Sequence, residues 1–308
     1  MEAIFPIRAV TQQTGLSPHV LRIWERRYDA VTPKRSNTNR RLYSEQDIEK
    51  LRLLRRLTDQ GHSIGQVAGL GLNQLKDLAQ QTPSAPAPGT VFSETLLELP
   101  TVKNFESHAM QKIKNLDPAG LEQILEIAAS ELSPRHLLEE LLPSLLEKIG
   151  ALWEKGKLGI AHEHVASTII RTFLSNMRSA YPIRPNAPRA VFATPPGQDH
   201  DLGALLAAKI AASEGWQPLF LGARVPPSEL VETVKQSKAK LVGLSVLPSQ
   251  GTDYLKSEIS RLGELLKGRC AWIVGGKGAR SLKGTVESAG GRILSNLEEF
   301  RIFLKGLA

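Results

Sequence analysis

Apolar residues in the first thirty positions recur every three or four residues, which is the spacing of one helix face. They predict short helices over residues 7–14 and 19–28, joined by the turn sequence GLSP. In the second helix, Val20, Leu21 and Trp24 fall on one face that can point inward. This arrangement is typical of a helix-turn-helix.

The segment after this pair, TPKRSNTNRRLYS, sets four cations among small turn-forming residues. A basic hairpin, or wing, would have this composition. Ser44 with Asp47 three positions later fits a capping box, so a further helix is expected from there. The N-terminal region is therefore predicted to be a winged helix-turn-helix.

The middle of the chain keeps helical spacing almost throughout residues 94–181. Pro143 is expected to start or kink a helix, because proline has no backbone N–H to donate. Gly156 and Gly159 interrupt the pattern before a helix that begins near Ala161. We expect a central four-helix bundle.

Beyond residue 188 the pattern changes to apolar runs of strand length that alternate with helices. The predicted strands are residues 190–194, 218–221, 241–246, 271–274 and 292–294, and the predicted helices are 203–214, 227–235, 254–266 and 278–288. Continuous apolar strands separated by helices indicate a parallel sheet covered on both faces, a doubly wound, Rossmann-like domain. Its ligand should lie beyond the carboxyl ends of the strands.

Two proline-rich breaks, QTPSAPAPGT and PIRPNAP, divide the chain. We predict a multidomain α and α/β protein with four parts: a winged-helix domain at 1–78, a linker at 79–93, a helical-bundle cap at 94–183 and a doubly wound domain at 187–308.

Composition narrows the class of protein. Of the 308 residues, 41% are hydrophobic and 23% charged, which is ordinary globular usage, and no apolar run approaches the roughly 18 residues of a membrane span. Glu2 and Arg8 interrupt any secretory signal, so we expect a soluble, cytoplasmic protein without membrane contact. The single cysteine, Cys270, excludes internal disulfides, and its apolar flank predicts a buried structural thiol.

The net charge of +8 permits a polyanion as partner, and cations crowd the first sixty residues. A small basic helical domain with solvated charges would also have this composition. However, residues 4–75, with LRIWERRY and the wing ending RRLYS, resemble the MerR superfamily of winged-helix transcription regulators. The resemblance implies binding to promoter repeats as a dimer or larger assembly, with the second helix in the major groove.

This resemblance also assigns candidate DNA-binding residues. His19 and Arg22 are the candidates for reading base edges. Phosphate or minor-groove contacts are expected from Arg26, Arg35, Arg40 and Arg41, with Tyr43 of the wing in the same DNA-binding set.

In the central region, Trp153 is followed after nine residues by Glu163 and His164. Taken alone, these residues also fit a core tryptophan, a carboxylate favoured at a helix N-terminus and a solvated histidine. Their spacing resembles the adenosylcobalamin-binding cap of CarH and LitR-type photoreceptor repressors. That resemblance implies that Trp153 and Glu163 cover the adenosyl group above cobalt, with His164 close by. Members of that group can carry a histidine directly after the tryptophan, whereas this chain has Glu154, so His162 or His164 would have to replace it as a second cobalt ligand.

In the last region, His200 lies three residues before Gly203 in TPPGQDHDLGALLAAKI. Alone, His200 could be a polar loop residue. Together with Ser245, Gly275 and Gly276, the loop resembles the cobalamin-binding module of corrinoid proteins. The resemblance implies that His200 is the lower cobalt ligand and that the small residues leave room for the nucleotide tail.

The usual motif of that module places an aspartate two residues before the histidine, where this chain has Gln198. A carboxylate would orient the imidazole and raise its basicity, whereas an amide accepts a hydrogen bond without charge. Asp199 or Asp201 could supply the missing carboxylate.

Together these resemblances predict an adenosylcobalamin-dependent, light-responsive repressor rather than an enzyme. It would bind promoter DNA in the dark as a homodimer or homotetramer and leave it when light breaks the cobalt–carbon bond. Two alternatives stay open: a light-independent regulator that senses cobalamin or another tetrapyrrole, and a corrinoid protein that carries methyl groups. The operator, the oligomer number and the photoproduct are left open by the sequence.

Overall fold

The protein is described by a computed structural model that covers residues 4–16, 18–35, 41–60, 62, 64–80, 101–177, 186–248 and 252–307. The chain forms two compact units, residues 1–173 and 174–308. Within the described ranges, no helix is both long and apolar enough to cross a membrane. The domain boundaries expected at 78, 93, 183 and 187 stay predictions.

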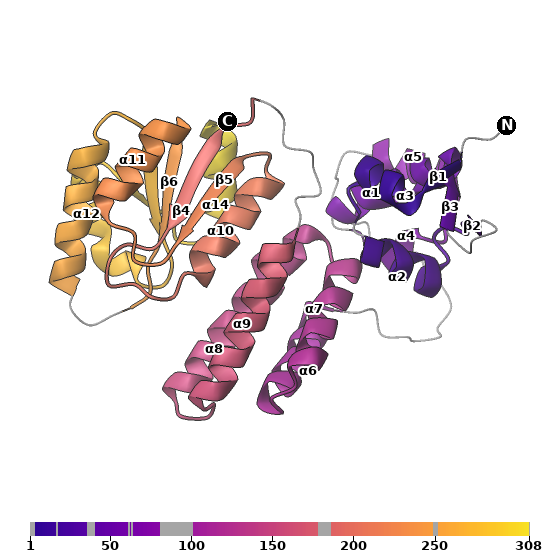
Figure 1. Ribbon diagram of the computed structural model, residues 1–308, viewed down its shortest axis with the longest axis horizontal. Helices are drawn as coiled ribbons and strands as arrows, with labels where there is room; N and C mark the ends of the chain where they lie inside the picture. The colour runs from indigo at the N-terminus through magenta and orange to yellow at the C-terminus, as the bar shows by residue number, and fades with distance from the viewer. Residues whose placement is uncertain are drawn as a thin grey trace, which may run out of the picture. The chain divides into compact units, whose positions relative to one another are not determined.

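The N-terminal part of the first unit has the predicted winged-helix layout (Figure 1). Its elements are β1 (Ile4–Pro6), α1 (Ile7–Thr14), α2 (Pro18–Tyr28), β2 (Lys34–Arg35), β3 (Arg41–Ser44), α3 (Glu45–Asp59), α4 (Ile64–Val67) and α5 (Leu72–Gln80). The three strands form an antiparallel sheet in the order β1-β3-β2, so β2 and β3 make the stem of the wing. The tip of the wing, residues 36–40, lies outside the described residues.

The helix boundaries in this part follow their local chemistry. Gly15 ends α1 in the left-handed conformation, at φ 72°, and its N–H donates to the Thr11 carbonyl at 3.0 Å. At the start of α3, the Asp47 N–H donates to Ser44 Oγ at 3.1 Å, and the Ser44 N–H donates to the Asp47 carboxylate at 2.8 Å. The predicted capping box is confirmed.

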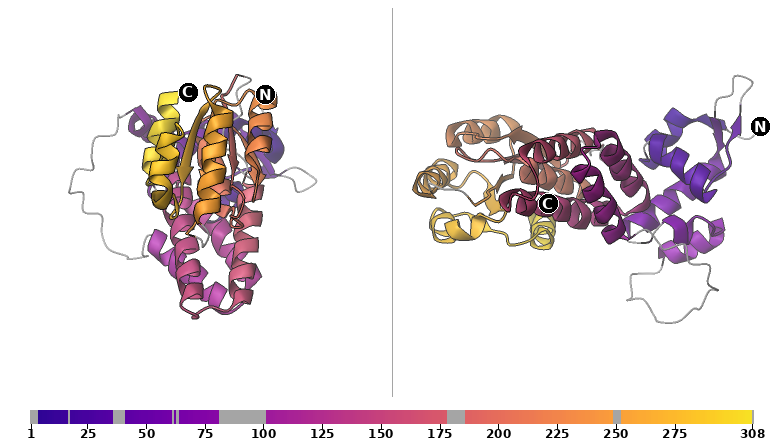
Figure 2. Two further views of the ribbon diagram at one scale, coloured as in Figure 1. Left: turned by 90° about the vertical axis from the view of Figure 1, so that its left-hand side faces the viewer. Right: turned by 90° about the horizontal axis from the view of Figure 1, so that it is seen from below.

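The rest of the first unit is a bundle of helices that run alongside one another (Figures 1 and 2). They are α6 (Val102–Lys114), α7 (Pro118–Glu131), a π-helical segment (His136–Leu141), α8 (Leu142–Glu154) and α9 (Ile160–Asn176). Pro143 lies in the first turn of α8, directly after the π-helical segment. Because proline has no N–H and clashes with the preceding turn, a regular α-helix cannot continue through it.

The second unit is a five-stranded parallel sheet with helices on both faces (Figure 1). Its elements are β4 (Arg189–Ala193), α10 (Leu202–Ser213), β5 (Gln217–Gly222), α11 (Pro227–Ser237), β6 (Leu241–Ser245), α12 (Thr252–Leu266), β7 (Ala271–Gly275), a 3-10 segment (Ala279–Leu282), α13 (Lys283–Ser288), β8 (Arg292–Ile293) and α14 (Leu297–Leu307). The strand order is β5-β4-β6-β7-β8, so the chain continues from β4 to one side with β5 and to the other side with β6, and the switch point lies between β4 and β6. In such sheets the ligand crevice lies at this switch point, beyond the carboxyl ends of the strands.

The predicted doubly wound domain is confirmed, with two local differences. The helix expected over 278–288 begins as a 3-10 segment and becomes α-helical only at Lys283. Cys270 is half-buried against the core rather than fully buried, and burial raises the pKa of its thiol to about 11. At neutral pH the group is a protonated thiol, as a structural role requires.

Candidate cofactor and nucleic-acid sites

The loop that follows β4 is fixed by buried hydrogen bonds. Thr194 is fully buried, and its hydroxyl donates to the Gln198 carbonyl at 2.6 Å and accepts from the Arg224 N–H at 3.1 Å. The backbone of Thr194 also bonds to Gly222 and Val225 in the loop after β5. The two loops at this edge of the sheet therefore form one hydrogen-bonded platform.

Gln198 joins this platform to the loop after β6. Its side chain is buried, at 4% exposure, and its amide oxygen accepts from the Leu247 N–H at 2.8 Å. This oxygen, a candidate acceptor for orienting His200, accepts from the neighbouring loop. Gln198 thus fixes the position of the loop.

His200 is presented at the exposed surface of this fixed loop. Of the two aspartates beside it, Asp199 pairs with Arg224, and this guanidinium lowers the pKa of the carboxyl, with a smaller contribution from His200. Asp201 is buried and lies near Gly222. Its side chain does not cap α10. The Asp199 carboxylate next to His200 in the loop is therefore already paired with the Arg224 guanidinium.

Four small residues predicted to accommodate the cofactor share this edge of the sheet. A Cβ added at Gly203 would lie 2.5 Å from Ser245 Oγ, so any other residue at this position would require the Ser245 side chain to move. Gly276 has φ 94°, and its added Cβ would lie 2.4 Å from the Val246 carbonyl oxygen. At both positions, close packing gives a structural reason for the glycine. Gly275, paired with Ser245 across the strands, differs because its added Cβ meets nothing closer than 3.9 Å.

At the bundle end that carries the α8–α9 connection, apolar side chains are exposed to solvent. Trp153 is 47% exposed near the end of α8, and Ile160 is 61% exposed at the start of α9. Leu116 in the α6–α7 connection is also exposed, and Figure 1 shows both connections at the same end of the bundle. The reading of Trp153 as a core residue is wrong. Exposed large apolar side chains gathered in one place are typical of a binding surface.

Next to this surface, two predicted cofactor residues contact each other. His164 Nδ1 lies 2.6 Å from the Glu163 carboxylate, and the His164 ring is largely exposed. His162 folds back over Gly159, and its Nδ1 is buried without a hydrogen-bond partner among the residues that the structure describes. Of these two histidines, His164 is the one with its ring in solvent and a carboxylate to orient it.

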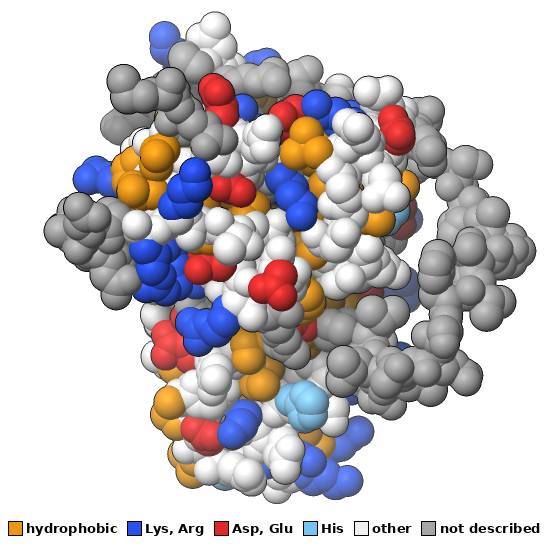
Figure 3. All heavy atoms as spheres, turned by 90° about the vertical axis from the view of Figure 1, so that its right-hand side faces the viewer, with side chains coloured by type: hydrophobic (Ala, Val, Ile, Leu, Met, Phe, Trp, Pro, Cys, Tyr) orange, Lys and Arg blue, Asp and Glu red, His pale blue; other side chains and the backbone are white. Residues whose placement is uncertain are grey.

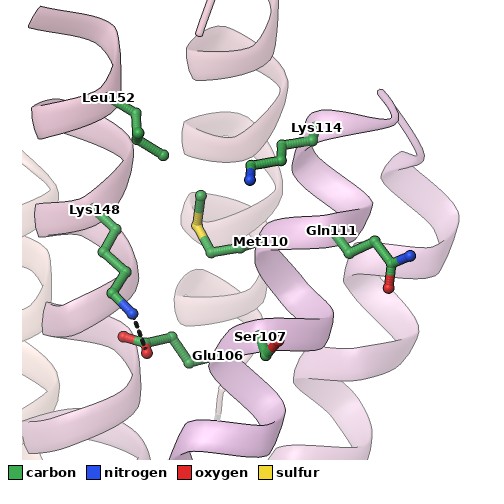
Figure 4. A pocket seen from close by; sticks show the side chains of 7 residues that line it. All are labelled: Glu106, Ser107, Met110, Gln111, Lys114, Lys148 and Leu152. Atoms are coloured by element: carbon green, nitrogen blue, oxygen red, sulfur yellow. Dashed lines mark hydrogen bonds and ion pairs between the residues drawn. The ribbon is translucent and has the colours of Figure 1, made fainter. Parts of the chain in front are cut away.

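A cavity of about 420 Å³ opens between α6 and α8 (Figure 4). At its floor, the buried Glu106 carboxylate bonds to Lys148 and Ser144. These two bonds lower the pKa of Glu106, against the opposing effect of burial. None of the predicted cofactor residues lines this cavity.

In the winged-helix part, the predicted DNA-binding residues are found in different settings. Arg22 and Arg26 are exposed on α2, and Arg35 is exposed on β2. His19 lies in α2, but its side chain and the whole of Arg40 are outside the described residues. Figure 3 shows that the cations on this side of the molecule alternate with carboxylates rather than form one uniform patch.

The assignment of Tyr43 to DNA needs correction, and Arg41 has a partner on α2. Tyr43 is fully buried, and burial raises the pKa of its phenol, so its ring supports the wing from inside and is not placed to touch DNA. The Arg41 Nε donates to both carboxylate oxygens of Glu25 on α2, at 2.8 and 3.0 Å. Glu25 thus joins the wing to the second helix, a role that no local sequence pattern predicts because the two residues are 16 positions apart.

Comparison with known proteins agrees with a helix-turn-helix at the N-terminus and with a B12-binding region in the bundle. Residues 5–71 match the family described as MerR HTH family regulatory protein, and residues 109–176 match the B12 binding domain. The second match spans the bundle helices that carry Trp153, Glu163 and His164. The chain thus combines a region that matches the MerR helix-turn-helix family with a region that matches the B12 binding domain.

Over almost its whole length the chain is similar to two repressors of Myxococcus xanthus. It is 29% identical to the HTH-type transcriptional repressor CarH over 300 residues, 97% of each chain, and 27% identical to the HTH-type transcriptional repressor CarA over 296 residues, 95% of this chain and 93% of the relative. The monomethylamine corrinoid protein of Methanosarcina barkeri shares the fold, with a TM-score of 0.54 and 18% identity over 67% of this chain and all of that one.

Proposed function

We propose that this protein is an adenosylcobalamin-dependent, light-responsive transcriptional repressor of the cytoplasm. In this proposal it binds promoter DNA in the dark as a homodimer or homotetramer and releases it after light breaks the cobalt–carbon bond. One observation carries the proposal: the same chain contains an exposed basic recognition helix and a B12-binding region whose tryptophan lies at the surface.

The residues at the carboxyl edge of the sheet fit a corrin bound through a protein imidazole. His200 is exposed on a loop that Thr194 and Gln198 hold in place, so its ring can approach a metal without rearrangement of the platform. A Cβ added at Gly275, which pairs with Ser245 across the strands, would meet nothing closer than 3.9 Å. A metal-binding imidazole needs a second group to fix its orientation, and we assign this role to Asp199, the carboxylate next to His200 in the loop.

The bundle residues fit the upper part of the same cofactor. We assign the exposed Trp153 ring to packing against the adenosyl group, because an indole offers a large flat apolar face. The Glu163 carboxylate can accept hydrogen bonds from ribose hydroxyls while it holds His164. When bound, adenosylcobalamin supplies a cobalt–carbon bond that visible light can break.

Loss of the adenosyl group would remove the contact that Trp153 and Glu163 make in the dark. The side chains would then be exposed again, which favours a different arrangement of the bundle. Light can shift the DNA-binding equilibrium only as far as the two arrangements differ in their affinity for assembly or DNA. The proposal therefore requires a measurable difference in assembly between dark and illuminated protein.

The test uses the full chain loaded with adenosylcobalamin in darkness. Absorption, sedimentation and binding to its own promoter DNA are measured before and after green light, beside a Trp153→Ala variant and protein kept dark. Loss of DNA binding and of assembly on illumination supports the proposal. The Trp153→Ala variant should no longer distinguish adenosylcobalamin from cobalamin without the adenosyl group. Unchanged DNA binding after complete photolysis contradicts the light response.

A light-independent cobalamin sensor is the second candidate, because Glu154 stands where a histidine could bind cobalt after photolysis. It predicts DNA binding that changes with cobalamin but not with light. The methyl-carrier alternative is favoured by a 26% identity to the dimethylamine corrinoid protein 3 of Methanosarcina acetivorans over 50% of this chain. It predicts methyl transfer to or from the bound corrin.

A further inference from the structure

Most of the net charge of the protein lies in residues 174–308, the doubly wound unit. Residues 174–308 contain 18 lysines and arginines against 11 aspartates and glutamates, an excess of seven out of the total of +8. Residues 1–173 contain 21 cations against 20 acids. The doubly wound unit is therefore a second basic part of this chain, because within residues 1–173 the excess of the winged-helix part, 13 cations against 8 acids in residues 1–80, is offset by the acidic bundle.

Part of this excess is concentrated at the amino-terminal edge of the sheet, opposite the His200 loop. A shallow hollow of about 480 Å³ lies where α11 and α12 end and where β6 and β7 begin. Its charged lining is entirely basic: Lys235, Lys238, Lys240 and Arg269. These four side chains and Lys267, which follows α12, are exposed, and we call the five residues the basic edge.

Local interactions do not neutralise the basic edge. Lys235 pairs with Glu232 at 3.5 Å, but the other four cations form no ion pair in the part of the chain that the structure describes. Cations are favoured at helix C-termini, and α11 and α12 both end here, but two helix ends supply only about one negative charge between them. Even with Glu264 of the last turn of α12 counted, the edge keeps a positive excess.

The character of the hollow favours a polyanion over a small anion. Its buried lining residues, Val234 and Ala239, are apolar, so no buried polar side chain is available to bind a single phosphate in a fixed geometry. Exposed lysines along an open edge instead suit a row of phosphates, because such binding comes mainly from counterion release. Duplex DNA is the polyanion that the same chain holds nearby through its helix-turn-helix, at high effective concentration.

We propose that the basic edge is a second, sequence-independent DNA contact of this protein, made by the doubly wound unit with phosphates that flank the site bound by the winged helix. Because it lies at the opposite edge of the sheet from His200, the contact does not compete with a ligand in the crevice. The proposal goes beyond DNA binding by the helix-turn-helix and rests on separate residues.

The test measures the salt dependence of full-chain binding to a fluorescent duplex of about 30 base pairs of mixed sequence, between about 50 and 200 mM KCl. The patch variant combines Lys238→Asn, Lys240→Gln and Arg269→Gln; asparagine suits the left-handed backbone of Lys238, at φ 54°. A control variant, Lys256→Gln with Lys283→Gln and Lys305→Gln, removes the same charge from lysines that pair with Asp253, Glu287 and Glu214.

Three lost phosphate contacts reduce the slope of log affinity against log salt by about 2.7, so the patch variant is about 40-fold less sensitive to salt across this range. The control variant should keep the wild-type slope. Equal slopes in the patch and control variants overturn the proposal, whether both match the wild type or both fall together. A change in sedimentation of the patch variant without a change in slope also overturns it, since the edge would then join copies of the chain.

The wild-type measurement separates this inference from the proposed function. If the wild type and both variants bind the duplex with one slope, only the basic edge is refuted and the winged helix remains the DNA contact. If the wild type binds no duplex at all, DNA binding itself is contradicted.

Discussion

The His200 loop and the wing hold their functional side chains in different ways. In the loop, neutral buried groups, the Thr194 hydroxyl and the Gln198 amide, make the fixing bonds, and the histidine stays exposed. In the wing, the fixing bond is itself an ion pair, between Arg41 and Glu25, and a residue expected at the DNA surface is partly used to hold the structure.

The difference follows from what each site must present. In our proposal His200 is a metal ligand, which has to offer one atom in one orientation, and a platform held by buried neutral groups provides that. A phosphate-binding surface tolerates several geometries, because long cations bind a chain of like charges. The comparison predicts that substitutions in the loop platform cost more stability than substitutions in the wing.

The largest effect is expected at the edge of the loop platform. Gly276→Ala should lower the free energy of unfolding by about 3–5 kcal/mol, because a positive φ and a 2.4 Å contact with the Val246 carbonyl oxygen both oppose the new methyl group. Gly290→Ala is the matched control, since Gly290 has φ 83° but nothing within 4 Å. It should cost only about 1 kcal/mol. Equal losses in urea unfolding would show that the close contact contributes nothing.

Gln198→Ala should cost about 1–3 kcal/mol, because it leaves the Leu247 N–H without its acceptor. The exposed Gln236, which bonds to Glu232, offers a control whose replacement by alanine should change stability by less than about 0.5 kcal/mol. Both are measured by urea unfolding. If the Gln198 variant is as stable as the control, the bond from Leu247 to Gln198 does not hold the loop in place.

The bundle provides a buried charge for comparison. Because Lys148 and Ser144 lower the pKa of Glu106, the carboxylate stabilises the fold above its ordinary pKa of 4.5, and this stability is lost as pH falls through the lowered folded-state pKa. Glu106→Gln should therefore reduce the stability difference between pH 7 and pH 3. Glu122→Gln, on an exposed position of α7, is the control and should leave that difference unchanged.

The smallest effect is expected in the wing. A double-mutant cycle on Glu25→Ala and Arg41→Ala should give a coupling of about 0.5–1 kcal/mol, since both side chains are partly buried. The more exposed pair Glu49 and Lys76 should give about zero in the same cycle. A larger coupling in the exposed pair would contradict the role assigned to Glu25.

Sequence patterns predicted the elements well because each depends on neighbouring residues. Strand-length apolar runs, the Ser44 capping box and the effect of Pro143 are all local signals. The errors concern partners that are distant in sequence. Tyr43 follows basic residues and was assigned to DNA, but the sheet turns its ring into the core, and only the folded chain brings Gln198 to Leu247.

The most direct test of the central claim is the electron paramagnetic resonance spectrum of protein-bound cob(II)alamin, recorded with natural and with ¹⁵N-labelled histidine. If a protein imidazole is the axial ligand, labelling changes the nitrogen splitting of the cobalt lines from triplets to doublets, and His200→Ala abolishes the change while the exposed control His108→Ala keeps it. Triplets that persist in the labelled wild-type protein would contradict the claim, because the axial nitrogen would then belong to the cofactor itself.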